Sequence, residues 1–261
     1  MTQDLYFEEY GEAGNPPLVF LHGLLGSSRN WRSVAKEMAC DYHIYCLDLP
    51  EHGESAHLPK TSLSIMQSRI EGWIEEQGLE KYRLCGHSLG GKLAMILACR
   101  WPQRVVSLTV ADIAPRDYPP EHHLPTFDAL LSLDLSGIKN RKHADEVLSE
   151  RIPNWAFRQF LLTNLISDGE GLRWRANLEV LRAGIADLSC NPLASADRYA
   201  GPTLVVRGGK SGYVRFEHFS LFDHYFADCS IVTLPEAGHD VHVEDRTGFV
   251  ISLHNFLNPK A

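Results

Sequence analysis

The chain has 261 residues, of which 44% are hydrophobic and 22% are charged, and its formal net charge is −8. This length predicts one large or two small domains with a substantial core, and the acidic balance argues against nucleic acid or a stably bound anionic membrane as partner. No apolar run approaches the roughly 18 residues that a membrane-spanning helix needs, and the N-terminal sequence MTQDLYFEEY has no secretory h-region.

The six cysteines are scattered along the chain and form no C-x-x-C pair. This pattern favours free thiols that behave as small hydrophobic residues in a reducing cytosol. We therefore expect a cytoplasmic protein with no metal site and no disulfide. The residues concerned are Cys40, Cys46, Cys85, Cys99, Cys190 and Cys229.

Short apolar runs alternate with longer segments that have helical spacing. The runs are continuous rather than alternating, which is typical of parallel strands covered on both faces. Strand–helix alternation predicts an α/β protein with a mostly parallel, doubly wound sheet that binds ligands at the carboxyl ends of its strands. The predicted strands are 17–23, 43–49, 82–88, 107–113, 203–209 and 230–238.

One interval interrupts this alternation. Roughly ninety residues separate the strand ending in ADI from the strand TLVVRGG, far more than one crossover needs. The interval contains several amphipathic patterns, namely HHLPTFDALLSLDL, RKHADEVLSERI, AFRQFLLTNLI and LRWRANLEVLRAGI. These patterns predict a helical cap over residues 116–195, inserted into a core domain that comprises residues 1–115 and 196–261.

The segment LCGHSLGGK (84–92) ends a predicted strand and leads directly into a predicted helix. It contains G-x-S-x-G in the strand–turn–helix setting that this motif requires, with Ser88 at its centre. A serine on so sharp a turn is strained, so the residues two before and two after it must be small. We predict that Ser88 is a nucleophile; the alternative is a glycine-rich start of a helix.

The segment FLHGLLGSS (20–28) places a turn beside this serine. We expect the backbone N–H groups of Leu24 and Leu89 to form an oxyanion hole, an assignment that depends on position alone. His22 is interpreted as a structural, hydrogen-bonding residue. In LDLPEHGES (47–55), Asp48 and His52 are expected to shape a loop rather than to take part in chemistry.

The last predicted strand is followed by LPEAGHDVHVED (234–245). His239 is the candidate general base, because it lies late in the chain, in a loop at the edge of the sheet that also carries Ser88. His242 is interpreted as a packed or capping residue.

Four segments, HGLLGSS, DLPEHGES, GHSLGGK and GHDVHVED, occur in the order typical of the α/β-hydrolase superfamily, which the chain resembles over essentially its whole length. The resemblance implies an α/β-hydrolase fold with the cap inserted after the sixth strand. In most members the catalytic acid follows the strand TLVVRGG, where this chain has Ser211. The nearby Glu217 lies well into the following helix. We therefore predict Asp112, at the end of LTVADIAP (108–115), as the acid that orients His239; the alternative is a helix or loop cap.

A narrower resemblance involves GHSLGGKLAM, ADIAP, FRQFLLTNL, LRWRANL and RGGKSGYV, which together are similar to YbfF-type esterases of bacteria and mitochondria. This resemblance implies that Ser211 is an auxiliary residue hydrogen-bonded within the Asp112–His239 pair, rather than a plain turn residue. It also implies hydrolysis of short- to medium-chain acyl esters and, in some members, of acyl-CoA thioesters.

Four further residues are candidates for substrate binding. Lys92, one turn into the helix after Ser88, is either a contact for an anionic substrate or a lysine with a buried stem and a solvated head. Trp174, Arg175 and Asn177 of the predicted cap are candidates for the polar end of a substrate. The family resemblance is their main support.

These observations predict a cofactor-free serine hydrolase that cleaves small-molecule acyl esters through an acyl-enzyme intermediate, as a monomer or homodimer. Two alternatives share the fold: a C–C lyase or hydrolase of the menaquinone-biosynthesis type, and a non-catalytic ligand-binding receptor. Turnover of simple p-nitrophenyl esters would distinguish the predicted esterase from both.

Overall fold

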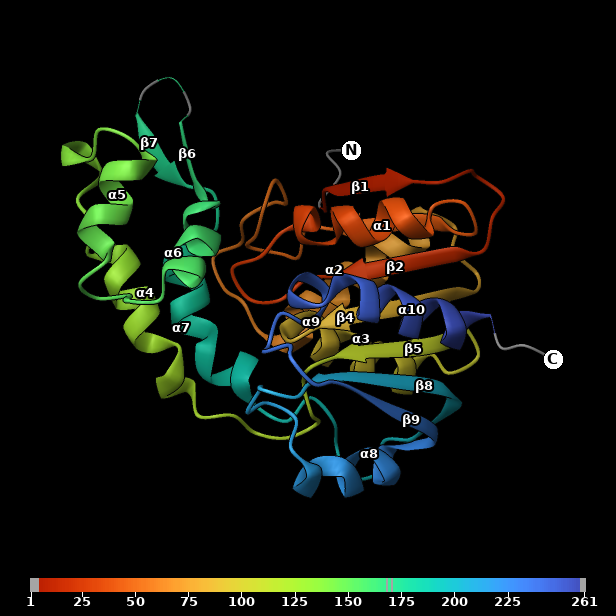
Figure 1. Ribbon diagram of the computed structural model, residues 1–261. Coiled ribbons are helices and arrows are strands. Elements are labelled where there is room, and N and C mark those ends of the chain that lie inside the picture. The colour runs from red at the N-terminus through yellow and green to blue at the C-terminus, as the bar shows by residue number, and fades with distance from the viewer. Residues whose placement is uncertain (1–4, 168, 170, 259–261) are drawn as a thin grey trace.

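The computed structural model describes residues 5–167, 169 and 171–258, and its centre is a seven-stranded sheet in the order β1-β3-β2-β4-β5-β8-β9 (Figure 1). All neighbouring strands are parallel except β1, which pairs antiparallel with β3. The predicted mostly parallel, doubly wound α/β sheet is confirmed. The strands are β1 (Phe7–Tyr10), β2 (Pro17–Leu21), β3 (His43–Leu47), β4 (Tyr82–His87), β5 (Val105–Ala111), β8 (Tyr199–Gly208) and β9 (Phe226–Leu234).

Helices cover both faces of the sheet, as continuous apolar strands require. One hydrophobic cluster contains residues of α1 and α10, and the other contains residues of α2 and α3. No helix in the described part of the chain is both long enough and apolar enough to cross a membrane. The helices of the core are η1 (Ser28–Trp31), α1 (Arg32–Met38), α2 (Leu63–Glu76), α3 (Leu89–Arg100), η4 (Phe216–His218), α8 (Phe219–Tyr225), α9 (Val241–Glu244) and α10 (Arg246–Leu257).

The long interval between β5 and β8 lies to one side of the sheet, at the left of Figure 1. Its position agrees with the predicted cap at 116–195, whose exact limits stay a prediction. Five described strands precede the insertion, which therefore follows the fifth strand and not a sixth strand as expected. The insertion contains η2 (Pro120–His122), α4 (Leu124–Leu131), η3 (Leu135–Gly137), α5 (Arg141–Leu148), α6 (Trp155–Leu162), β6 (Leu165–Ser167), β7 (Leu172–Trp174) and α7 (Leu178–Ser189).

Two short elements differ from the prediction. The stretch around Leu172–Trp174 was expected to be helical, but it pairs antiparallel with β6. Gly169, between the two strands, has φ +93°, a conformation that favours glycine. The edge strand β1 was not predicted, because its sequence FEEY is only partly buried and carries no continuous apolar run.

Two buried histidines hold the loops that follow β2 and β3. His22 Nε2 accepts the backbone N–H of Leu49 (2.9 Å), and His52 Nε2 accepts the backbone N–H of Leu25 (3.0 Å). In each ring Nδ1–H donates to a nearby backbone carbonyl at 2.8 Å. Both rings are therefore neutral, and burial lowers the pKa of His22 to about 4 and that of His52 to about 3. These contacts agree with the structural roles expected for both residues.

Asp48 closes the second of these loops. Its buried carboxylate accepts the backbone N–H groups of Ser28 (2.6 Å) and Glu54 (2.8 Å). The loops after β2 and β3 are thus held together by polar side chains, as the sequence predicted for this residue.

The two histidines predict loss of stability in mild acid. As the pH falls below the ordinary histidine pKa of about 6.5, His22 and His52 become protonated in the unfolded chain. In the folded protein both rings stay neutral down to about pH 4, because burial lowers their pKa values. The free energy of unfolding should fall by about 1.4 kcal/mol per pH unit for each histidine in this range. Urea unfolding between pH 5 and 7 measures the slope. In His52→Gln the slope of the unfolding free energy against pH should be smaller by about 1.4 kcal/mol per pH unit, which corresponds to one proton. An unchanged slope would contradict the assignment of His52 as a neutral, buried residue.

Candidate active site

Ser88 lies on the sharp turn between β4 and α3. Its φ of +51° is in the left-handed region, where a non-glycine residue is strained. A Cβ at Gly86 would lie 2.2 Å from the carbonyl oxygen of Gly90, and one at Gly90 would lie 2.3 Å from that of Leu21. Side chains are therefore excluded on both sides of Ser88, which is the physical reason for the G-x-S-x-G spacing.

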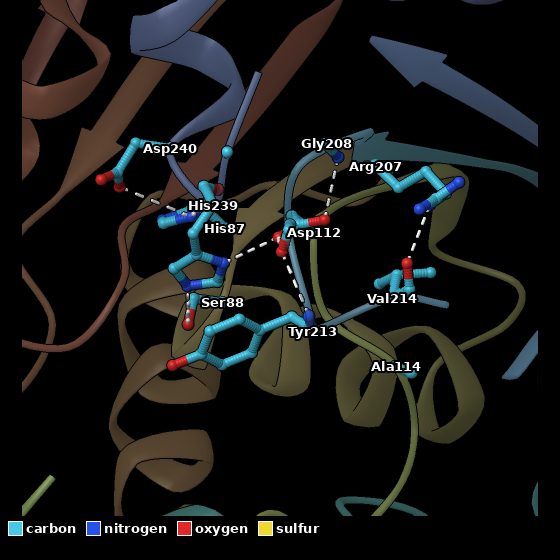
Figure 2. Close-up of polar contacts among 12 residues, drawn as sticks. His87, Ser88, Asp112, Ala114, Arg207, Gly208, Tyr213, Val214, His239 and Asp240 are labelled. Carbon is cyan, nitrogen blue, oxygen red and sulfur yellow. Dashed lines mark hydrogen bonds and ion pairs between the residues drawn. The ribbon is translucent and has the colours of Figure 1, made fainter. Parts of the chain in front are cut away.

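His239 lies in the loop after β9 and contacts both Ser88 and Asp112 (Figure 2). The hydroxyl of Ser88 donates to His239 Nε2 (3.0 Å), and His239 Nδ1–H donates to Asp112 Oδ2 (2.8 Å). The structure thus brings together the three residues that the sequence nominated as nucleophile, base and acid. Their catalytic roles stay a prediction at this point.

Asp112 directly follows β5, between the strands that carry Ser88 and Ser211, and its side chain is fully buried. Besides His239, the carboxylate accepts the backbone N–H of Gly208 (3.0 Å) and the hydroxyl of Ser211. The backbone of Asp112 has φ +48°, so this residue also occupies a strained position. Three donors therefore compensate the cost of burying this carboxylate.

The hydrogen bond expected at the vacated acid position is present, but Glu217 lies in the short η4 turn before α8 rather than well into a helix. Ser211 donates to Asp112 Oδ2 and accepts the backbone N–H of Tyr213 (3.1 Å), so the expected hydrogen bond is present. Glu217 is exposed and lies within 4 Å of Arg215 and His218 instead.

Two neighbours of His239 were not identified from the sequence. The ring of Tyr213 stacks on the imidazole of His239, with centroids 3.8 Å apart and an interplanar angle of 16°. His87 Nε2–H donates to the backbone carbonyl of His239 (3.0 Å), and burial lowers the pKa of His87 to about 4. Neither contact leaves a signal in the sequence, because each joins distant segments. His242 is buried and stacks on Trp31, as the prediction of a packed residue requires.

Ser88 faces a pocket with about 350 Å³ of empty space, part of it continuous with solvent. Most of its walls are apolar. Leu24 and Leu89 both line it beside Ser88, where an oxyanion hole would have to be, and their role stays a prediction. The other lining residues are Lys92, Ile113, Tyr118, His123, Ile185, Leu188, Ser189 and Tyr213.

Lys92 lines the pocket, where its contact with an anionic substrate stays a prediction, whereas the alternative of a solvated head is wrong. Its head is not solvated, because the side chain is 3% exposed and Nζ donates to the carbonyls of Leu188 (3.1 Å) and Cys190 (2.6 Å). Burial lowers the pKa of Lys92 to about 8. The end of α7 packs over α3 at this point, and its free carbonyls bind the ammonium that we expected in water or on a substrate.

The other candidate substrate contacts do not line this pocket. Trp174 belongs to β7 and packs against the hydrophobic core. Arg175 Nε lies 3.3 Å from Glu54 Oε1, and Asn177 Nδ2 donates to Glu51 Oε2 (2.7 Å). These three residues lie where the insertion joins the core, so periodicity alone did not reveal which surface they face.

No group of three or more His, Cys, Asp or Glu side chains in the described ranges is placed to hold a metal ion. All six cysteines are free thiols.

Comparison with known proteins confirms the resemblance stated from the sequence. Residues 18–252 match the model of the alpha/beta hydrolase family. The sn-1-specific diacylglycerol lipase ABHD11 of Mus musculus is 37% identical over 254 residues, 95% of this chain and 82% of the relative. Esterase YbfF of Escherichia coli is 29% identical over 245 residues, 94% of each chain. A solved structure, of a marine microorganism esterase, is 33% identical with a TM-score of 0.93, and the match covers 97% of this chain and 99% of that one. The chain belongs to the alpha/beta hydrolase family.

Proposed function

We propose that this protein is a carboxylic ester hydrolase in which Ser88 is the nucleophile, His239 the general base and Asp112 the acid. The observation that carries this proposal is the unbroken hydrogen-bond chain from Ser88 Oγ through His239 to Asp112, at the wall of a mainly apolar pocket. Relatives named as esterases and a lipase support ester cleavage. The complete chain of three residues also disfavours a non-catalytic receptor.

In the first half of the reaction, Ser88 Oγ attacks the acyl carbonyl carbon and His239 Nε2 takes the hydroxyl proton. Asp112 accepts the hydrogen bond from His239 Nδ1–H, which selects the tautomer with a free Nε2 and stabilises the imidazolium that forms. His239 then protonates the leaving alcohol, which departs and leaves the acyl group on Ser88.

The tetrahedral intermediate carries a negative oxygen, which the N–H groups of Leu24 and Leu89 would bind. Leu89 is the first residue of α3, where the backbone N–H has no intrahelical acceptor and the helix dipole is positive. In the second half, His239 takes a proton from water as the water oxygen attacks the acyl carbon. The ester bond to Ser88 Oγ then breaks, the carboxylic acid leaves, and the proton returns to Ser88 Oγ.

The proposed substrates are esters of short- to medium-chain acyl groups, with acyl-CoA thioesters as a further class. The pocket supports this choice, because the walls beside Ser88 are mainly apolar, as an acyl chain requires. Ser211 would assist by holding Asp112 in the orientation that His239 requires.

Removal of the nucleophile gives the first test. Ser88→Ala should lower the kcat for p-nitrophenyl butyrate by about 10⁶-fold, because the variant lacks the hydroxyl that His239 Nε2 contacts. An unchanged melting temperature controls for folding. Near-normal turnover by the folded variant would remove the nucleophile assignment.

The position of the acid is tested separately. Asp112→Asn should lower kcat by about 10⁴-fold, because the amide favours the wrong tautomer of His239. The matched control is Glu217→Gln, which should keep wild-type kcat, because Glu217 is exposed and pairs with Arg215 and His218. The opposite pattern in steady-state assays would place the acid at residue 217.

The auxiliary serine should have a smaller effect. Ser211→Ala removes one of the three donors to Asp112 and should lower kcat about tenfold. Ser211→Thr keeps the hydroxyl and should retain most of the activity. Equal kcat values for the wild type and the alanine variant would reduce Ser211 to a turn residue.

A further inference from the structure

Lys92 connects the helix that follows the nucleophile to the helix that forms the opposite wall of the pocket. It lies one turn along α3, where its backbone N–H donates to the carbonyl of Ser88 (3.0 Å). Its side chain lines the pocket, and Nζ reaches the carbonyls of Leu188 and Cys190 at the C-terminal end of α7.

The ammonium group donates two hydrogen bonds to backbone carbonyls of the protein. The last carbonyls of a helix have no intrahelical donor, and the helix dipole makes this end negative, so a buried cation is favourable there. The remaining side of Nζ faces the ring of Tyr118, with 5.2 Å to its centroid. Two of the three ammonium donors thus bind carbonyls at the end of α7, which supports a role of Lys92 in positioning this helix.

Helix α7 forms one wall of the pocket, through Ile185, Leu188 and Ser189. Figure 1 shows this helix running from the insertion toward the sheet. At its start, Asn177 donates to the buried Glu51; near its end, the carboxylate of Asp187 accepts the backbone N–H of Leu63 (2.6 Å). Helix α7 is therefore held to the core at both ends, and Lys92 is the attachment made from the helix of Ser88.

We propose that Lys92 determines acyl-chain-length specificity by holding α7 at a fixed distance from α3. This inference rests on the proposed esterase function and deepens it. Without the ammonium, the carbonyls of Leu188 and Cys190 lose their donor and the wall formed by α7 can move outward. Longer acyl chains then gain access relative to short ones.

The test is a substrate series from p-nitrophenyl butyrate to p-nitrophenyl dodecanoate. Lys92→Met has a similar length but no donor, and its ratio of kcat/KM for the dodecanoyl to the butanoyl ester should rise about tenfold over the wild type. The matched control is Lys142→Met, whose side chain is 87% exposed and which should keep the wild-type ratio. An unchanged ratio in folded Lys92→Met overturns the proposal.

If Lys92→Met does not fold, Lys92→Gln replaces it. The glutamine amide is shorter and neutral, so it should form weaker hydrogen bonds with the carbonyls of Leu188 and Cys190 than the ammonium does. The ratio of kcat/KM for the dodecanoyl to the butanoyl ester should therefore rise about threefold. A wild-type ratio in this variant overturns the proposal equally.

A measurement without substrate separates this proposal from the esterase function. Hydrogen exchange of the backbone amides of α7 should be about tenfold faster in Lys92→Met than in the wild type, because the end of the helix has lost an anchor. Unchanged exchange overturns the role of Lys92 whatever the substrate. If exchange in α7 is faster in Lys92→Met, Lys92 anchors this helix. If, in addition, the wild type cleaves no ester of the series, the esterase function is overturned while the anchoring role of Lys92 is supported.

Discussion

The buried carboxylate of Asp112 is the constraint on which the site depends. A carboxylate without solvent contact is costly unless hydrogen bonds replace its water, and its donors here come from β8, from the loop after β8 and from the loop after β9. Satisfying Asp112 therefore requires β5, β8 and β9 to lie side by side, as they do. The same contacts that make the carboxylate tolerable also place His239 against Ser88.

An acid after β5 changes what the loop after β8 can contribute. That loop has no carboxylate to present to His239, so it supplies a hydroxyl to Asp112 through Ser211 and an aromatic ring to the imidazole through Tyr213. Arg207 Nε donates to the carbonyl of Val214 (2.8 Å), which holds the loop to the strand before it (Figure 2). The imidazole of His239 thus contacts a carboxylate at one edge and an aromatic ring at one face.

The insertion is joined to the core by the polar residues that seemed suited to a substrate. Lys92, Arg175 and Asn177 are long or amide side chains, and each contacts a polar group across the junction between the insertion and the core. The ends of helices have unpaired backbone groups, so a helical insertion needs such side chains where it contacts the core. The apolar surface of α7, by contrast, lines the pocket.

Local patterns in the sequence determined the six parallel strands of the sheet, the turn at Ser88 and the order of the three site residues. The strands follow from continuous apolar runs, and the turn follows from Gly86 and Gly90, because neither position has room for a Cβ. Even the contact between Asp112 and His239 could be predicted, since the carboxyl ends of parallel strands share one edge of the sheet and Asp112 stands at such an end.

Only the tertiary structure decided the environment of each side chain. The stacking of Tyr213 on His239, the support from His87 and the burial of Lys92 against α7 all join segments that are distant in sequence, so no spacing or periodicity encodes them. Likewise β1 and the β6–β7 hairpin are too short to produce a pattern of their own and become strands by pairing. The sequence determined which groups can do chemistry; packing between distant segments decided which of them meet.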